Sequence, residues 1–117
     1  MTISIYHNPR CSKSRQALQI LRDQGHEAVV IEYLVNPPNT ETLDALCVAM
    51  GKEPLEITRT GEPLFKELGL SKNDTRTRQE WLNLLATNPK LIERPIVACG
   101  ERAVLGRPPE DVLSILS

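Results

Sequence analysis

The sequence predicts an α/β fold built on a mixed four-stranded sheet with a helical insertion. Three observations support this prediction: a strand–helix–strand pattern opens the chain, helical patterns fill its middle, and two strands and a helix close it. The element order is therefore βαβ, helical insertion, ββα. At 117 residues the chain has the size of one domain. We expect a single domain over residues 1–117, with the insertion at approximately 39–91.

Two β-branched runs and an amphipathic helix form the opening βαβ unit. Ile3 to Tyr6 predicts the first strand, and Val29-Val30-Ile31 predicts a second strand that is buried and parallel to the first. The helix between them ends at Gly25, which suits the position just after a helix. Its predicted inner face comprises Ala17, Leu18, Ile20 and Leu21.

The middle of the chain reads as helical from about Asn39 onward. A stripe with helical spacing ends at Gly51, and Thr77 and Glu80 have the spacing of a capping box, which predicts another helix. The stripe consists of Leu43, Leu46, Cys47 and Met50, and the second helix would bury Trp81, Leu84 and Leu85. Shorter helical pieces are expected at 54–58 and 63–68. Cys47 is therefore predicted to be a core residue.

The last part of the chain predicts a hairpin and a helix. Ile96–Cys99 and Arg102–Leu105 are strand-like, and Gly100-Glu101 between them suits a tight turn. A helix opens at Pro108, and its predicted inward residues are Val112, Leu113 and Leu116. With the opening βαβ unit, this order gives a thioredoxin-like layout. Cys99 is predicted to pack inside its strand, and a role as a resolving thiol stays open.

Composition narrows the class of protein. With 14 Lys and Arg against 15 Asp and Glu, the chain lacks the excess positive charge that is typical of proteins that bind nucleic acid. We also expect no membrane partner and a cytoplasmic location, because the sequence shows neither an export signal nor an apolar run of spanning length. Three scattered cysteines without a CxxC pair, and only two histidines, predict neither a disulfide scaffold nor a metal site.

Cys11 is the strongest candidate for chemistry. It lies between the first strand and the first helix, where unpaired backbone N–H groups and the helix dipole favour a thiolate over a thiol. Arg10 and Arg15 flank it with positive charge. The alternative is a small buried cysteine that only fills space, but polar and basic neighbours on both sides favour a reactive thiol.

Three arginines beside chain breaks, Arg59, Arg94 and Arg107, are candidates for binding an oxyanion. Lowering a thiol pKa by about two units takes roughly 2.7 kcal/mol, whereas a helix terminus typically supplies about 0.3–1 kcal/mol. Arginines and direct N–H hydrogen bonds must therefore contribute if Cys11 ionises at neutral pH. For any one of the three taken alone, a solvated surface arginine is the simpler interpretation.

Two further residues bear on this site. His7 either forms a hydrogen bond within the loop and helps to hold the thiolate, or covers the first helical turn with its ring. The Arg94-Pro95 step opens the first strand of the ββα half. In thioredoxin-like folds a cis-proline at this point lies against the active cysteine, so we expect a cis peptide bond at Pro95.

The chain resembles the glutaredoxin-coupled arsenate reductase family along its whole length, and is similar to a shorter branch of it. The matching segments are Tyr6-His7-Asn8-Pro9, Cys11, Ser14-Arg15, Glu62-Pro63, Glu67-Leu68-Gly69-Leu70, Glu93-Arg94-Pro95-Ile96-Val97 and Arg107-Pro108. A departure is Ser12, where the well-studied reductases usually carry glycine. The family fold is a thioredoxin-like core with a helical insertion, which agrees with the layout above.

The resemblance implies a single-cysteine mechanism. Cys11 would attack arsenate, and Arg59, Arg94 and Arg107 would hold the oxyanion. Glutathione, as co-substrate, and glutaredoxin, as partner, would complete the reduction to arsenite, with no bound cofactor. His7 matches a family histidine thought to influence the thiolate, and Arg10, Ser14 and Arg15 are expected to support it as well.

Two other functions compete with this one. A general monothiol oxidoreductase would act on glutathione mixed disulfides through Cys11-x-x-Ser14. A redox-sensing transcription regulator of the same fold would bind RNA polymerase, but such a switch usually uses CxxC, and Ser14 removes the second sulfur.

Overall fold

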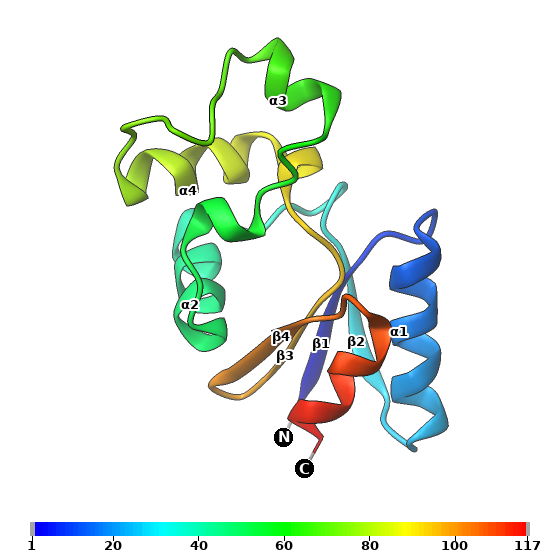
Figure 1. The fold of residues 1–117 in the computed structure, drawn as a ribbon. Helices are drawn as coiled ribbons and strands as arrows, with labels where there is room; N and C mark the ends of the chain where they lie inside the picture. The colour runs from blue at the N-terminus through cyan, green and yellow to red at the C-terminus, as the bar shows by residue number, and fades with distance from the viewer. Residues whose placement is uncertain (1, 117) are drawn as a thin grey trace. The chain divides into compact units, whose positions relative to one another are not determined.

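The structure is a computed structural model that describes residues 2–116. The chain forms two compact units. The first unit combines both ends of the chain, up to Asn36 and from Arg94, and the second unit comprises Pro37–Glu93. The second unit thus covers nearly the same residues as the helical insertion expected from the sequence. Figure 1 shows the elements of each unit in chain order.

A mixed four-stranded sheet forms the first unit, which confirms the predicted fold class. Its strands are β1 (Ile3–His7), β2 (Ala28–Glu32), β3 (Ile96–Cys99) and β4 (Arg102–Leu105), in the order β2-β1-β3-β4. β1 runs parallel to β2 and antiparallel to β3, which pairs antiparallel with β4. The parallel pair requires a crossover connection, and α1 (Ser12–Asp23) supplies it.

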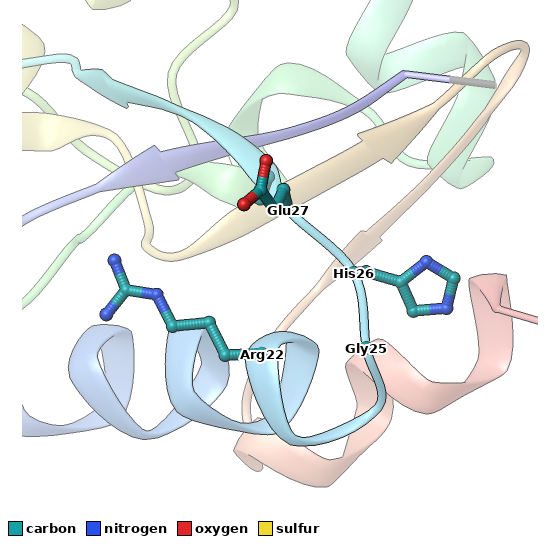
Figure 2. Close-up of a pocket in the computed structure, with 5 residues that line it drawn as sticks. Arg22, Gly25, His26 and Glu27 are labelled. Atoms are coloured by element: carbon teal, nitrogen blue, oxygen red, sulfur yellow. The ribbon is translucent and has the colours of Figure 1, made fainter.

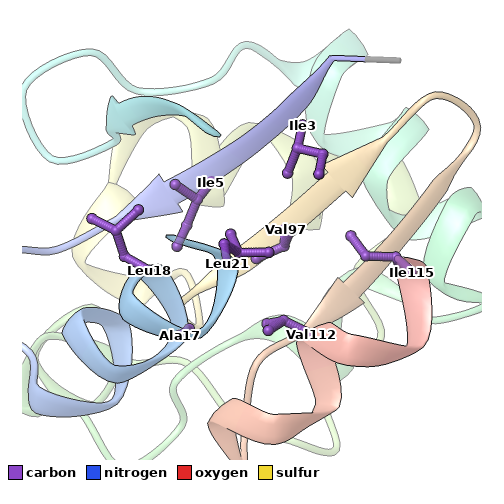
Figure 3. Packing of buried hydrophobic residues seen from close by; sticks show 8 residues of the cluster. All are labelled: Ile3, Ile5, Ala17, Leu18, Leu21, Val97, Val112 and Ile115. Atoms are coloured by element: carbon purple, nitrogen blue, oxygen red, sulfur yellow. The ribbon is translucent and has the colours of Figure 1, made fainter. Parts of the chain in front are cut away.

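The core of this unit lies between the sheet and two helices, α1 and the 3-10 helix η3 (Pro109–Ile115). Figure 3 shows these side chains directed into one layer. They are Ile3, Ile5, Ala17, Leu18, Leu21, Val97, Val112 and Ile115, and each is at most 8% exposed. Because β1 and α1 both pack into this layer, the loop between them, which carries Cys11, is anchored at both ends.

Two sequence expectations about burial in this unit were wrong. β2 is an edge strand, and Val29 and Val30 are 51% and 40% exposed, because a strand at the edge has a neighbour on one side alone. In η3, Val112 and Ile115 face the core and Leu113, predicted to face inward, is exposed, whereas Leu116 just after the helix packs against the core as predicted. A 3-10 helix has three residues per turn, so positions three apart share one face.

The second unit is helical. It contains α2 (Thr40–Met50), η1 (Pro54–Ile57), α3 (Pro63–Glu67), α4 (Arg78–Thr87) and η2 (Pro89–Leu91). Asn39 caps α2 by accepting the Thr42 N–H at 2.8 Å, and Thr77 forms the predicted capping box with Glu80 at the start of α4. The inward face of α4 consists of Trp81, Leu82 and Leu85. Leu84 was predicted in place of Leu82. Among the described residues, no helix combines the length and apolar character needed to cross a bilayer.

Candidate active site

Cys11 is the N-cap residue of α1, as its position between strand and helix predicts. Its extended backbone turns the chain from the loop into the helix, and its N–H donates to the Asn8 carbonyl at 3.0 Å. The residue is partly buried and its thiol is free. A thiol at this position faces the first N–H groups of the helix, which have no partners within the helix.

The surroundings of Cys11 lower the pKa of its thiol below the ordinary value. Burial raises the pKa, but several contributions of opposite sign outweigh it. The backbone N–H groups of Ser14 and Lys13 act as donors that lower the pKa, and the Arg94 guanidinium lowers it through its charge and as a donor. The helix start and the arginine therefore lower the thiol pKa together, which raises the fraction of reactive thiolate.

Ser14 links this helix start to β1. The side chain is fully buried, and its Oγ lies 2.6 Å from His7 Nδ1 and accepts the Asn8 N–H at 3.0 Å. Burial of His7 lowers the pKa of the imidazole. A neutral ring can accept a hydrogen bond from the Ser14 hydroxyl at Nδ1. His7 thus forms a hydrogen bond with Ser14, in the first turn of the helix that Cys11 caps. Its influence on the thiolate stays a prediction.

Replacing Ser14 with alanine should destabilise the fold. The change leaves the buried His7 Nδ1 and the partly buried Asn8 N–H without the hydroxyl. Leaving one buried polar group unsatisfied typically costs about 1–3 kcal/mol. Ser12→Ala, at an exposed position in the same helical turn, is the matched control. We expect urea unfolding to show a clear loss of stability for Ser14→Ala alone. Equal stabilities of the two variants would contradict this account of the Ser14 hydroxyl.

Arg10 and Arg15 order the loop that carries Cys11. The Arg15 guanidinium donates to the Pro9 carbonyl at 2.8 Å, and the Arg10 backbone N–H donates to Asn8 Oδ1 at 3.0 Å. Both arginine side chains are exposed. Their support of the thiolate by charge stays a prediction, whereas the contacts seen here restrain the shape of the loop.

Two peptide bonds within residues 2–116 are cis, and each joins an arginine, Arg94 or Arg107, to a proline. The Arg94–Pro95 bond is cis, the geometry that the sequence led us to expect, and Arg107–Pro108 is also cis, which the sequence analysis missed. Arg107 donates from Nη1 to the Arg94 carbonyl at 3.2 Å. The first unit therefore brings together Cys11, Arg94 and Arg107 through a short series of contacts.

Arg59 belongs to the second unit. Its Nη1 lies 3.2 Å from Glu62 Oε2 and its Nε lies 4.0 Å from Glu93 Oε1. Its backbone N–H donates to the Leu91 carbonyl at 2.7 Å, next to an isolated bridge between Thr58 and Ile92. Arg59 is thus held at a fixed point of its own unit, and its role toward an oxyanion stays a prediction.

The other cysteines have no comparable surroundings. Burial raises the pKa of the Cys47 thiol to about 11, and the residue packs fully buried in α2 as predicted. Cys99 ends β3, where it is half-buried and packs against the core of the first unit. Residues 2–116 contain no group of three His, Cys, Asp or Glu side chains that could hold a metal ion.

A pocket of about 490 Å³ lies at the opposite end of α1 from Cys11, and it is a separate feature. Figure 2 shows Arg22 on the last turn of α1, Glu27 directly before β2, and His26 directed away from Arg22. Since these side chains do not converge on one point, this pocket suggests no chemistry.

Comparison with known proteins identifies the family of this chain. The profile of the ArsC family matches residues 6–115. A Rhizobium meliloti protein named arsenate reductase is 41% identical over 116 residues, which cover 99% of this chain and 82% of the relative. The uncharacterized protein YfgD of Escherichia coli K12 is 43% identical over 115 residues, which cover 97% of this chain and 96% of the relative.

A solved structure agrees with these matches. The arsenate reductase from Vibrio cholerae superposes with a TM-score of 0.93 at 45% identity, covering 98% of each chain. Because this superposition covers nearly all of both chains, it includes both the thioredoxin-like core and the helical unit. On the combined ground of profile, sequence and structure, this protein belongs to the ArsC family.

Proposed function

We propose that this protein is an arsenate reductase that uses Cys11 as its one nucleophile. The observation that carries the proposal is the Cys11 thiol at the start of α1, whose pKa is lowered by backbone N–H groups of the helix start and by the Arg94 guanidinium. A guanidinium that already pairs with a thiolate also suits an incoming oxyanion. We take the oxyanion to be arsenate because relatives such as the Rhizobium meliloti protein are named arsenate reductase.

The proposed reaction begins when the Cys11 thiolate forms a bond to arsenic and expels water or hydroxide. Arg59, Arg94 and Arg107 bind the arsenate oxygens and balance the charge that develops on them. Glutathione then attacks the adduct. Arsenic gains two electrons and leaves as arsenite, while the two thiols lose these electrons and end as a mixed disulfide of Cys11 and glutathione. A glutaredoxin takes up the glutathionyl group and regenerates the thiol.

This scheme sets the cellular requirements of the protein. Glutathione is a co-substrate, glutaredoxin is the protein partner, and the scheme uses no bound cofactor, nucleic acid or membrane surface. A reducing compartment must supply the glutathione, so we propose the cytoplasm. His7 and Ser14 hold the start of α1 in place, which keeps the N–H groups of Lys13 and Ser14 directed at the sulfur.

A coupled assay tests the proposal. It contains the purified protein, glutathione, glutaredoxin, glutathione reductase and NADPH, and records NADPH oxidation after addition of arsenate. We expect oxidation that depends on arsenate and stops when either glutathione or glutaredoxin is omitted. Exchange on a glutathionylated peptide without any arsenate-dependent turnover would overturn the proposal in favour of a general monothiol oxidoreductase. Cys11-independent capture of RNA polymerase would favour a transcription regulator.

A further inference from the structure

The segment after β4 makes paired contacts with the segment that carries Arg94. Gly106 N–H donates to the Pro95 carbonyl at 2.8 Å, and the Arg107 guanidinium donates to the Arg94 carbonyl at 3.2 Å. Two consecutive residues thus bind the carbonyl of the cis peptide bond itself and the carbonyl of the residue that follows it. Such an arrangement fixes both the position and the orientation of the Arg94 backbone.

Gly106 also leaves no room for a side chain. A Cβ atom there would lie 2.9 Å from Pro95 Cγ, 3.1 Å from Val112 Cγ1 and 3.5 Å from Ala17 Cβ. The first of these distances is shorter than packed carbon atoms tolerate, and neither the Pro95 ring nor the buried Val112 has space to yield freely. Glycine therefore allows β4, η3 and the Arg94–Pro95 segment to meet beside α1.

We infer that Gly106 and Arg107 are positioning residues, which hold the Arg94–Pro95 segment against α1 so that the Arg94 guanidinium stays beside the Cys11 sulfur. The Gly106–Arg107 pair acts through Arg94, and it acts before any substrate binds. Ala17 lies in the helix that begins next to Cys11, and its Cβ is 3.5 Å from the place that a Gly106 Cβ would take, so the close approach at Gly106 sets Arg94 relative to the helix that presents the thiol. This role of Arg107 is additional to its proposed contact with arsenate.

The inference rests on Cys11 as the proposed nucleophile, but its test requires no arsenate and no glutathione. The measurement is the rate at which iodoacetamide alkylates Cys11 near neutral pH, followed by mass spectrometry of the Cys11 peptide. Alkylation joins the thiolate sulfur to carbon and releases iodide, so the rate reports the thiolate population. Failure in the arsenate assay and failure in this test are therefore distinguishable.

Three single variants carry the first part of the test. Gly106→Ala and Arg107→Ala should each slow Cys11 alkylation several-fold, because Arg94 is then held less firmly beside the sulfur. Gly61→Ala is the matched control, since a Cβ atom at Gly61 meets nothing within 4 Å, and it should leave the rate unchanged. Circular dichroism and thermal melting establish that each variant is folded. Arg107 is exposed, so Arg107→Ala keeps the test decisive if Gly106→Ala fails to fold.

The second part is a double-mutant cycle with Arg94→Ala. If Gly106 and Arg107 act through Arg94, neither substitution should slow alkylation further once Arg94 is absent. If Arg107 acted by its own charge on the sulfur, its effect would persist and add to that of Arg94→Ala. Additive effects, or full alkylation rates in folded Gly106→Ala and Arg107→Ala, would overturn the inference.

Discussion

Cys11→Ser is expected to abolish arsenate-dependent NADPH oxidation in the coupled assay. The serine hydroxyl is far less ionised than a thiol at neutral pH, and an oxygen atom in place of sulfur cannot form the mixed disulfide from which glutaredoxin recovers the enzyme. The loss should therefore be complete to the background of the assay, and added glutathione should not restore turnover.

Cys99→Ser provides the control for this prediction. Cys99 is half-buried at the end of β3, and the proposed scheme uses one protein thiol, so this variant should retain most of the activity. Appreciable turnover by Cys11→Ser would contradict the scheme. Loss of turnover in Cys99→Ser, with the fold intact by circular dichroism, would instead assign Cys99 a role as a second thiol.

Arg94→Ala is expected to lower kcat/KM for arsenate by about 100-fold or more, the loss typical of one charge-stabilising donor in a reaction site. Two effects combine here. The Cys11 thiol no longer has the Arg94 charge and donor beside it, both of which lower its pKa. The arsenate oxygens no longer have the guanidinium that would bind them. Raising the assay pH repopulates the thiolate, so it should recover the first part of the loss and leave the second.

Arg94→Lys separates charge from geometry. It keeps a positive charge but loses the planar fork that binds two oxygens at once. We expect steady-state kinetics to place it between the native protein and Arg94→Ala, with a smaller rise in the thiol pKa. Native kinetics in Arg94→Ala would remove Arg94 from the mechanism, since no part of the loss would then depend on its side chain.

Local chemistry explains which parts of the fold were predictable from sequence. The α2 stripe around Leu43 and Cys47, the Thr77 capping box and the turn at Gly100 depend on neighbouring residues, and each prediction agrees with the structure. The exposure of Val29 depends instead on the order of strands in the sheet. A β-branched run has the same pattern at an edge as at the centre, so periodicity could not reveal it.

Long-range contacts explain what the sequence analysis missed in the candidate site. Cys11 was identified from its place before the first helix, and the Pro95 cis bond from the layout of the fold. The contact between His7 and Ser14 depends on the angle between β1 and α1, which spacing does not specify. Gly106 had one weak signal, a glycine directly before the Arg107-Pro108 step, but the atoms that a side chain there would meet come from three separate parts of the chain.

The pH dependence of Cys11 alkylation tests the central claim most directly. Rates for the native protein are measured across a pH series and compared with rates for the same cysteine in the urea-unfolded chain. Because folding favours the thiolate, the folded protein should reach half of its maximal rate at a lower pH than the unfolded chain. Arg94→Ala should move that midpoint upward. A folded midpoint at or above that of the unfolded chain would contradict the account, because Cys11 would then be an ordinary or disfavoured thiol.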